Sequence, residues 1–301
     1  MAVAPTRAPA LPGAMTAQPP RGAGPLALAW RRLSRNQLAL FGSIVAVIYI
    51  LLGVFGPMLA PYDYAKQDLL HANLPPLSPG HILGTDQVGR DLFSRLVTGI
   101  RISLYVGFGV TAISMVIGTA AGAIAGYRRG WADSFISAVV EFTWGFPLIL
   151  LAVILAATLG PGLRATILAV GLINWAGFAR VVRGEVMGLR EAEFVEAARA
   201  SGLGEARILV RHILPNIMAP ALVMASYYVA LGIIAEAGLS FIGMGAQPPL
   251  PSLGVMIAEG RNYMLQNQWV TTIPGVAIVA VVLGLNLLGD GLRDVLDPRL
   301  K

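Results

Sequence analysis

The chain has no cysteine and, among its 301 residues, only two lysines, Lys66 and Lys301. Without cysteine it forms no disulfides and offers no thiol chemistry. Neither lysine stands in the G-x-x-x-x-G-K-[ST] pattern, whose lysine and backbone amides hold nucleotide phosphates. The sequence therefore excludes a Walker A nucleotide-binding site.

Charge is scarce as well. Asp, Glu, Lys and Arg make up 13% of the residues and hydrophobic side chains 56%, whereas soluble domains carry about 25% charged residues. Such a chain has too little polar surface to cover a globule, so we expect a membrane protein in contact with lipid. The net charge of +6 is typical of loops that face anionic lipid, and we expect no nucleic-acid partner.

Residues suited to catalysis or metal binding are also few. The three histidines, His71, His81 and His212, lack metal-ligand spacing, and we expect the first two on the opposite side of the membrane from the third. No serine stands in a nucleophile-elbow context. We therefore predict no metal site, no catalytic residues and no enzymatic activity in this chain.

Long apolar runs, by contrast, are abundant. A helix that crosses the hydrocarbon core needs about 20 mostly apolar residues. Six segments meet this requirement: roughly 38–60, 102–127, 134–158, 165–183, 216–243 and 270–290. The predicted fold class is an all-α membrane protein with six transmembrane helices, although the fourth segment ends in FARVVRGEV rather than at a clean apolar stop.

The loops between these segments differ in positive charge. If the N-terminus lies inside the cell, most of the 22 Lys and Arg residues fall on the cytoplasmic side. The outer side then receives only Lys66, Arg90, Arg95, Arg101, Arg164 and Arg261. Because cytoplasmic loops carry the excess of Lys and Arg, we predict that both termini are cytoplasmic.

Outside the spans, residues 1–25 are rich in Pro, Ala and Gly and lack a signal-peptide core, so we expect a disordered cytoplasmic tail. Residues 26–37 combine an apolar side with arginines and predict an interfacial amphipathic helix. A second interfacial helix, capped by Thr85 or Asp86, is expected within 85–103, because Val88, Leu92, Leu96 and Ile100, with Phe93 and Val97 beside them, form an apolar stripe on one face. For both helices the alternative is an extension of the neighbouring span.

Within the spans, Gly118, Gly122 and Gly126 form a small-xxx-small series that lets helix backbones approach closely. Pro147 should kink the third span. Two acids, Glu141 and Glu236, lie within predicted spans. Each acid either lines a polar pathway, forms a proton relay or is a hydrogen-bonded structural acid, and the sequence leaves these readings open. A pathway at Glu236 would also include Ser240 and Phe241.

The loop before the fifth span carries good helix formers from residue 185 to 200, and Gly202 is placed to end that helix as a left-handed C-cap. A second short helix is expected over about 204–212, with Pro215 restarting the chain as the fifth span. Residues 196–215, EAARASGLGEARILVRHILP, resemble the EAA loop of ABC-importer permeases. The matching residues are Glu196, Ala197, Ala198, Gly202, Leu214 and Pro215.

His212 stands where the general pattern prefers Ile, as in the peptide and nickel branch of that family. Three further stretches resemble the same branch: HILGTDQVGRDLFSRLVTGIRISL (81–104), EAGLSFIGMGAQPPLPSLG (236–254) and GDGLRDVLDPRL (289–300). The chain is most similar to the C-type permeases of dipeptide and oligopeptide importers, over nearly everything after the N-terminal tail.

This resemblance implies a type I ABC importer permease fold, with a six-span permease domain over 38–301 and an ATPase-coupling loop at about 184–215. In that loop Arg207 and His212 join the residues named above. The implied partners are a second permease in a heterodimer, two ATP-binding subunits that bind ATP and Mg²⁺, and an extracytoplasmic substrate-binding protein. The implied location is the bacterial cytoplasmic (inner) membrane, with no cofactor in this chain itself.

Several alternatives stay open at this point. The chain is also compatible with a proton-coupled secondary transporter or with a membrane subunit that has no pathway. Within the resemblance, dipeptides, longer oligopeptides, glutathione-like compounds and nickel chelates are not separated by the motifs. His212 either marks the peptide branch, stabilises the second short helix or contacts the ATPase.

Overall fold

The computed structural model describes residues 36–296, and this part of the chain is almost entirely helical. Strand pairing within it is limited to the isolated bridges Ser78–His81 and Thr85–Asp91. The helices are α2 (Gln37–Leu59), α3 (Leu92–Arg128), α4 (Gly130–Trp144), α5 (Leu148–Leu159), α6 (Leu163–Arg190), α7 (Glu193–Ala200), α8 (Glu205–Ile208), α9 (Leu214–Phe241), α10 (Leu253–Gly260) and α11 (Trp269–Leu296). The predicted tail (1–25) and nearly all of the predicted interfacial helix (26–37) lie outside the described residues.

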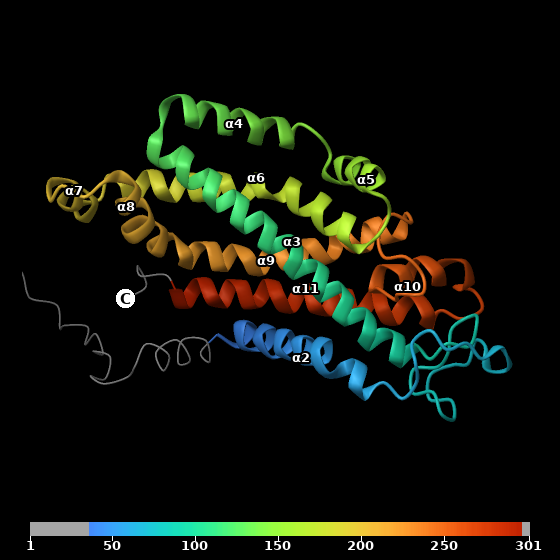
Figure 1. Ribbon diagram of the computed structural model, residues 1–301. Helices are drawn as coiled ribbons and strands as arrows, with labels where there is room; N and C mark the ends of the chain where they lie inside the picture. Colours follow the sequence, from blue (N-terminus) through green and yellow to red (C-terminus); the bar gives the residue numbers. More distant parts are fainter. Residues whose placement is uncertain (1–35, 297–301) are drawn as a thin grey trace, which may run out of the picture.

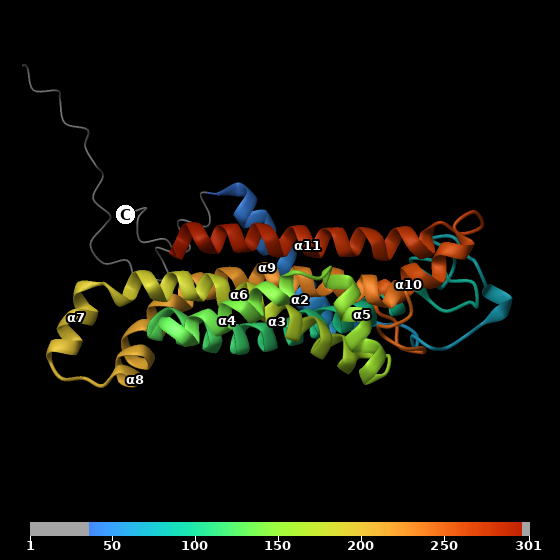
Figure 2. The same ribbon diagram turned by 90° about the horizontal axis from the view of Figure 1, so that it is seen from above.

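The long helices run side by side as a bundle. The short helices α7 and α8 lie at one end of it, and α10 with the loops around it lies at the opposite end (Figures 1 and 2). In the described part of the chain five helices are long and apolar enough to cross a membrane, or six if the bent pair α4–α5 counts as one span. The predicted class of multi-pass, all-α membrane protein is confirmed.

The predicted interfacial helix within 85–103 is wrong, and its alternative is right. The second span begins at Leu92 and continues without a break to Arg128. Its N-cap is Asp91, whose Oδ2 accepts the backbone N–H of Ser94 at 2.8 Å, and not Thr85 or Asp86. Of the apolar stripe that suggested a lipid interface, Leu92, Val97 and Ile100 are buried in the protein and Val88, Phe93 and Leu96 are half-buried. Val97, for example, packs against Gly56 of α2.

The third span is not one continuous helix. The segments α4 and α5 meet at an angle of 93°, with Gly145, Phe146 and Pro147 between them. Pro147 is the N-cap of α5, so the predicted kink is present but is sharper than a bend within a helix. The missing N–H of proline and the clash of its ring with the preceding turn end α4 here.

The fourth span, α6, reaches Arg190 and so continues through the polar FARVVRGEV segment. Its long contact with α3 depends on the predicted glycine series. A Cβ atom on Gly118 would lie 2.5 Å from the Trp175 carbonyl oxygen, and one on Gly126 would lie 2.7 Å from that of Arg183. A Cβ on Gly122 would overlap the Ala179 carbonyl oxygen. The two backbones therefore touch along three turns, as small-xxx-small spacing permits.

We predict that Gly122→Ala destabilises the protein, because one methyl group would push apart two packed backbones. Overpacking of this kind costs about 1–3 kcal/mol, so thermal unfolding of the purified protein in detergent should begin several degrees lower. The matched control is Gly184→Ala on α6, where an added Cβ meets nothing within 4 Å. Equal unfolding temperatures for the two variants would contradict the importance of this contact.

Candidate functional site

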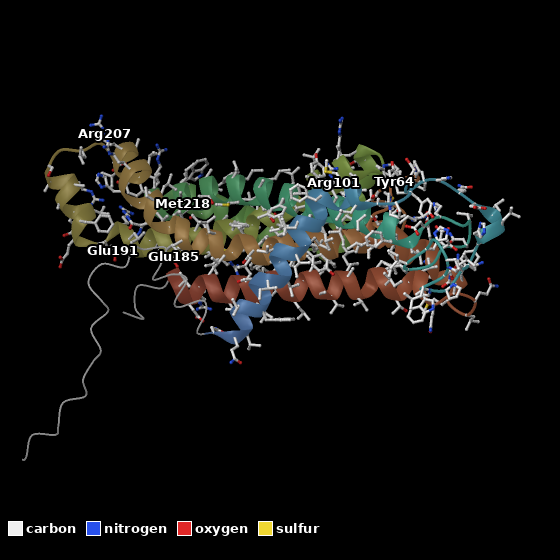
Figure 3. The ribbon with its side chains drawn as sticks, turned by 90° about the horizontal axis from the view of Figure 1, so that it is seen from below. Tyr64, Arg101, Glu185, Glu191, Arg207 and Met218 are labelled. Carbon is white, nitrogen blue, oxygen red and sulfur yellow. The ribbon has the colours of Figure 1, made fainter. Side chains whose placement is uncertain are left out.

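The predicted EAA residues lie on a compact element at one end of the bundle, which we call the α7–α8 segment (residues 191–213). Figure 3 shows Glu191 and Arg207 at this end and Tyr64 at the other. The segment links the end of α6 to the start of α9. The length of the bundle separates it from the loops around α10 at the other end.

The helix α7 ends as the sequence predicts. Gly202 has a φ of +78°, a conformation that glycine adopts without steric cost. The Leu203 N–H donates to the Ala198 carbonyl at 3.2 Å, which satisfies a carbonyl left free at the helix end.

Two other details of the prediction are wrong. α6 extends to Arg190, and a turn at residues 191–192 separates it from α7, so residues 185–200 are not one helix.

The second correction concerns Pro215. After α8 the chain forms a π-helical turn, Leu209–Ile213, and runs directly into α9. The Leu214 N–H donates to the carbonyl of Leu209, five residues back. Pro215 lies in the first turn of α9, where its missing N–H costs little, so it continues the helix rather than restarting the chain.

One face of the α7–α8 segment is fixed to the bundle by apolar contacts. Val195, Ile208 and Ile213 are fully buried. They form a cluster with residues of α3, α6 and α9: Ala123, Tyr127, Val182, Val186 and Ile217. Since buried apolar area stabilises by about 25 cal/mol per Å², the segment is held as a body and not as a free loop.

The other face carries most of the predicted coupling residues. Glu196, Ala197, Gly202, Arg207 and Pro215 are exposed, His212 and Leu214 are half-buried, and Ala198 is buried. His212 lies in the π-helical turn, and its carbonyl accepts the Asn216 side-chain amide at 2.6 Å. The exposed residues make a small, charged surface that another protein is able to approach closely.

At the opposite end of the bundle lies a group of buried charges that the sequence analysis missed, and we call it the Arg95 cluster (Asp86, Arg90, Arg95 and Glu259). Asp86 Oδ2 accepts from Arg90 Nε at 2.6 Å and from Arg95 at 2.7 Å. Glu259 Oε2 accepts from the same two arginines, both at 2.7 Å. The side chains of Asp86 and Arg95 are only 1% and 2% exposed.

Each arginine in the Arg95 cluster therefore faces two carboxylates, so the charges balance. Such balance is required when ions are removed from water. The cluster joins the loop before α3 to α3 itself and to α10. Neighbouring bonds extend it, because Asp91 also binds His81 at 2.8 Å and the Asn267 amide donates to the Thr85 carbonyl at 2.9 Å.

The unusual arginines were visible in the sequence as positive charges on a side where few are expected. Their partner was not, because Glu259 is 164 positions from Arg95. A second ion pair in the same loops, His71 with Asp68 at 2.8 Å, is exposed to solvent. Its hydrogen bond lowers the pKa of Asp68 below the ordinary value.

Of the residues predicted for a pathway, Glu236 and Ser240 are buried and hydrogen-bonded to each other, and Phe241 is exposed. Glu236 is fully buried, accepts a hydrogen bond from Ser240 Oγ at 2.6 Å and faces Ser103 of α3 at 3.4 Å. Ser240 is buried too, and Phe241 is exposed. In this structure Glu236 holds α9 to α3, and a pathway role for the three residues stays a prediction. Within residues 36–296 no group of three or more His, Asp or Glu is placed to bind a metal.

We predict that Arg95→Met loosens the loops around the Arg95 cluster, because it leaves Asp86 and Glu259 with too little positive charge in a buried place. Breaking a buried pair by removing one partner costs about 3–5 kcal/mol. Limited proteolysis should then cut the 61–91 loop many times faster than in the wild type. Asp68→Asn removes the exposed ion pair of the same loop and should leave the cleavage rate nearly unchanged. Equal cleavage of both variants would show that the Arg95 cluster does not hold the loops.

Comparison with known proteins adds relatives over almost the whole chain. Residues 118–301 match the family described as "binding-protein-dependent transport system inner membrane component". Residues 24–76 match the "N-terminal TM domain of oligopeptide transport permease C".

Three curated relatives illustrate the range of names. The dipeptide transport system permease protein DppC of Alkalihalophilus pseudofirmus is 42% identical over 273 residues, which cover 91% of this chain and 90% of the relative. The glutathione transport system permease protein GsiD of Pectobacterium atrosepticum is also 42% identical, with 90% of each chain covered. The oligopeptide transport system permease protein OppC of Bacillus subtilis is 38% identical, with 90% of this chain and 88% of that one covered.

Among solved structures, an inward-facing form of the MetNI methionine ABC transporter is similar, with a TM-score of 0.55 and 25% identity. The similarity covers 67% of this chain and 96% of that chain.

Proposed function

This chain belongs to the family of binding-protein-dependent transport system inner membrane components, and on that premise we propose that it is the permease subunit of an ABC importer that takes up short peptides. It is a multi-pass membrane protein and a transport permease rather than a catalytic enzyme. The observation that carries the proposal is the α7–α8 segment, which is exposed on one face and anchored on the other.

The α7–α8 segment has the properties that a coupling element needs. A force applied to the exposed side of α7 reaches α3, α6 and α9 through Val195 and Ile208, because both side chains are buried against those helices. In the proposed importer this force comes from two partner ATPases, which bind ATP and Mg²⁺. A short helix transmits such a displacement, whereas an unstructured loop would absorb it.

The remaining subunits follow from the same premise. A second permease forms the other half of the pathway, and an extracytoplasmic binding protein delivers the cargo to the outer loops. The loop at 61–91 and the region around α10 are supported for this role by the Arg95 cluster, which joins them into one surface. Residues 92–100, which follow this loop in the sequence, belong to α3. The surface therefore rests on the first turns of that helix.

The relatives support peptides as the cargo. Their printed names refer to dipeptides, oligopeptides and glutathione, which share amide-linked backbones and charged ends. Family membership also favours ATP-driven import over the proton-coupled alternative.

Reconstitution tests this function directly. The complex of both permeases and the ATPases is placed in proteoliposomes with the binding protein, and uptake of a radiolabelled dipeptide is measured. We expect uptake that requires both ATP and the binding protein. Uptake driven by a proton gradient without ATP would refute the proposal.

We predict that Gly202→Val lowers the number of peptides imported per ATP hydrolysed. Valine at a φ of +78° is strained, by about 1–2 kcal/mol or more, and unwinding the end of α7 relieves this strain. The matched control is Gly204→Val, because Gly204 has a φ of −66° and an added Cβ meets nothing within 4 Å. Coupling equal to wild type in both variants would argue against α7 as the lever.

We further predict that Glu196→Lys weakens binding of the ATPases, because it reverses a charge on the exposed face of α7. The measurement is the fraction of ATPase that co-purifies with the permeases at increasing salt. Asp63→Lys makes the same change at an exposed position in the loop at the opposite end of the bundle, and should keep the ATPases bound. Undiminished co-purification with Glu196→Lys would remove this residue from the docking surface.

A further inference from the structure

A polar pocket of about 90 Å³ lies between α4 and α6, close to the break in the third span. Its lining residues are Ile136, Ser137, Val140 and Glu141 of α4 and Ala179, Arg180 and Arg183 of α6. We call it the Glu141–Arg180 pocket. A carboxylate and a guanidinium that share one pocket in a membrane-spanning region are costly there and need a reason.

The two arginines of the pocket differ in their partners. Arg183 is paired with Asp133 through two hydrogen bonds, one of them 2.8 Å long. Arg180 is exposed, and no carboxylate of the described residues pairs with it. Its guanidinium instead lies over the indole ring of Trp144, 4.1 Å from the ring centroid. This stacking limits where the group points and leaves its N–H donors free for a ligand.

Glu141 lacks a partner as well. Between residues 36 and 296 no hydrogen bond or ion pair involves its side chain, which is exposed. Gly130 is the first residue of α4, and Glu141 lies about 16 Å from it along the helix axis, given the rise per residue of an α-helix. A free carboxylate and a free guanidinium thus line one small space, on neighbouring helices, while the next arginine is neutralised.

Aromatic groups border the same place. The sharp turn after α4 leaves Phe142, Trp144 and Phe146 exposed. Gly177 of α6 has no side chain, and the Tyr228 hydroxyl of α9 fills that position, with Trp144 Cζ2 3.8 Å from the same point. Three helices therefore contribute a carboxylate, a guanidinium, a hydroxyl and exposed aromatic rings to one region. This is the composition of a site for a small polar molecule.

We propose that the Glu141–Arg180 pocket binds the charged ends of a dipeptide during import, with its α-ammonium on Glu141 and its α-carboxylate on Arg180. This rests on the proposed function, in which the cargo is a peptide. The pocket is too small for a whole dipeptide, so the side chains of the cargo lie outside it, against the exposed rings. Because only a very short peptide brings both ends into one pocket, the site selects dipeptides over longer oligopeptides.

Binding to the purified complex tests the proposal without the binding protein, which has its own preferences. The complex of both permeases and the ATPases, free of ATP, is equilibrated with tritiated Ala-Ala. N-acetyl-Ala-Ala, which lacks the ammonium, and Ala-Ala amide, which lacks the carboxylate, serve as competitors. Each loses one charge-assisted contact, so we expect each to bind about 10- to 100-fold more weakly than Ala-Ala.

Two variants then assign the contacts. In Glu141→Gln the penalty for N-acetylation should disappear while that for amidation remains, and in Arg180→Gln the reverse should hold. A loss of folding would weaken all three ligands alike, so this crossed pattern is specific to direct contact. Glu185→Gln removes an exposed carboxylate of α6 that lies outside the pocket, and it should keep both penalties.

Three results would overturn the pocket. They are equal affinity of the wild-type complex for the three ligands, no saturable binding at millimolar dipeptide, and penalties that stay unchanged in both variants. The wild-type comparison needs no variant, so it holds even where a variant fails to assemble. If the wild-type complex imports dipeptides with ATP and yet shows one of these results, the pocket is wrong and the proposed function stands. If it imports no peptide at all, the proposed function fails.

Discussion

The contact between the backbones of α3 and α6 is the constraint on which the other parts of this structure depend. Lipid tails are as apolar as leucine, so helices in a bilayer associate through close packing rather than through the hydrophobic effect. Here Gly118, Gly122 and Gly126 permit that packing. The contact fixes the helix that carries Arg95 at one end against the helix that carries Arg180 and leads into α7. If α3 and α6 packed loosely, the Arg95 cluster, the Glu141–Arg180 pocket and the α7–α8 segment would not be held in fixed positions relative to one another.

The protein treats its charges in two ways. At the Arg95 cluster two arginines and two carboxylates neutralise each other out of water, so their desolvation is offset by four short ionic hydrogen bonds. At the break in the third span, Glu141 and Arg180 have no such partners among the described residues. The first arrangement holds segments of the chain together. The second keeps its bonding capacity available for something that arrives and leaves.

Much of the fold could be predicted from the sequence, because the signals are local. Apolar length located the spans, Pro147 marked the break and Gly202 marked the end of α7. The errors arose where distant residues decide the outcome. The stripe from Val88 to Ile100 suggested a lipid surface, because no residue near it in the sequence indicates that α2 and α10 cover it. In the same way Glu259, which neutralises Arg95, is too far along the chain to be matched with it. The π-helical turn before Pro215 has no simple residue signature at all.

One consequence of α3 concerns its length. A helix of 37 residues measures about 55 Å, whereas the hydrocarbon core of a bilayer is about 30 Å thick. The helix therefore extends beyond the hydrocarbon as one rigid strut. The Arg95 cluster lies at one end of it, and Tyr127 packs beneath the α7–α8 segment at the other. A strut of fixed length does not stretch or shorten under load. A displacement on one side of the membrane must reappear on the other as tilt or rotation, which makes this helix a mechanical connection between the two compartments.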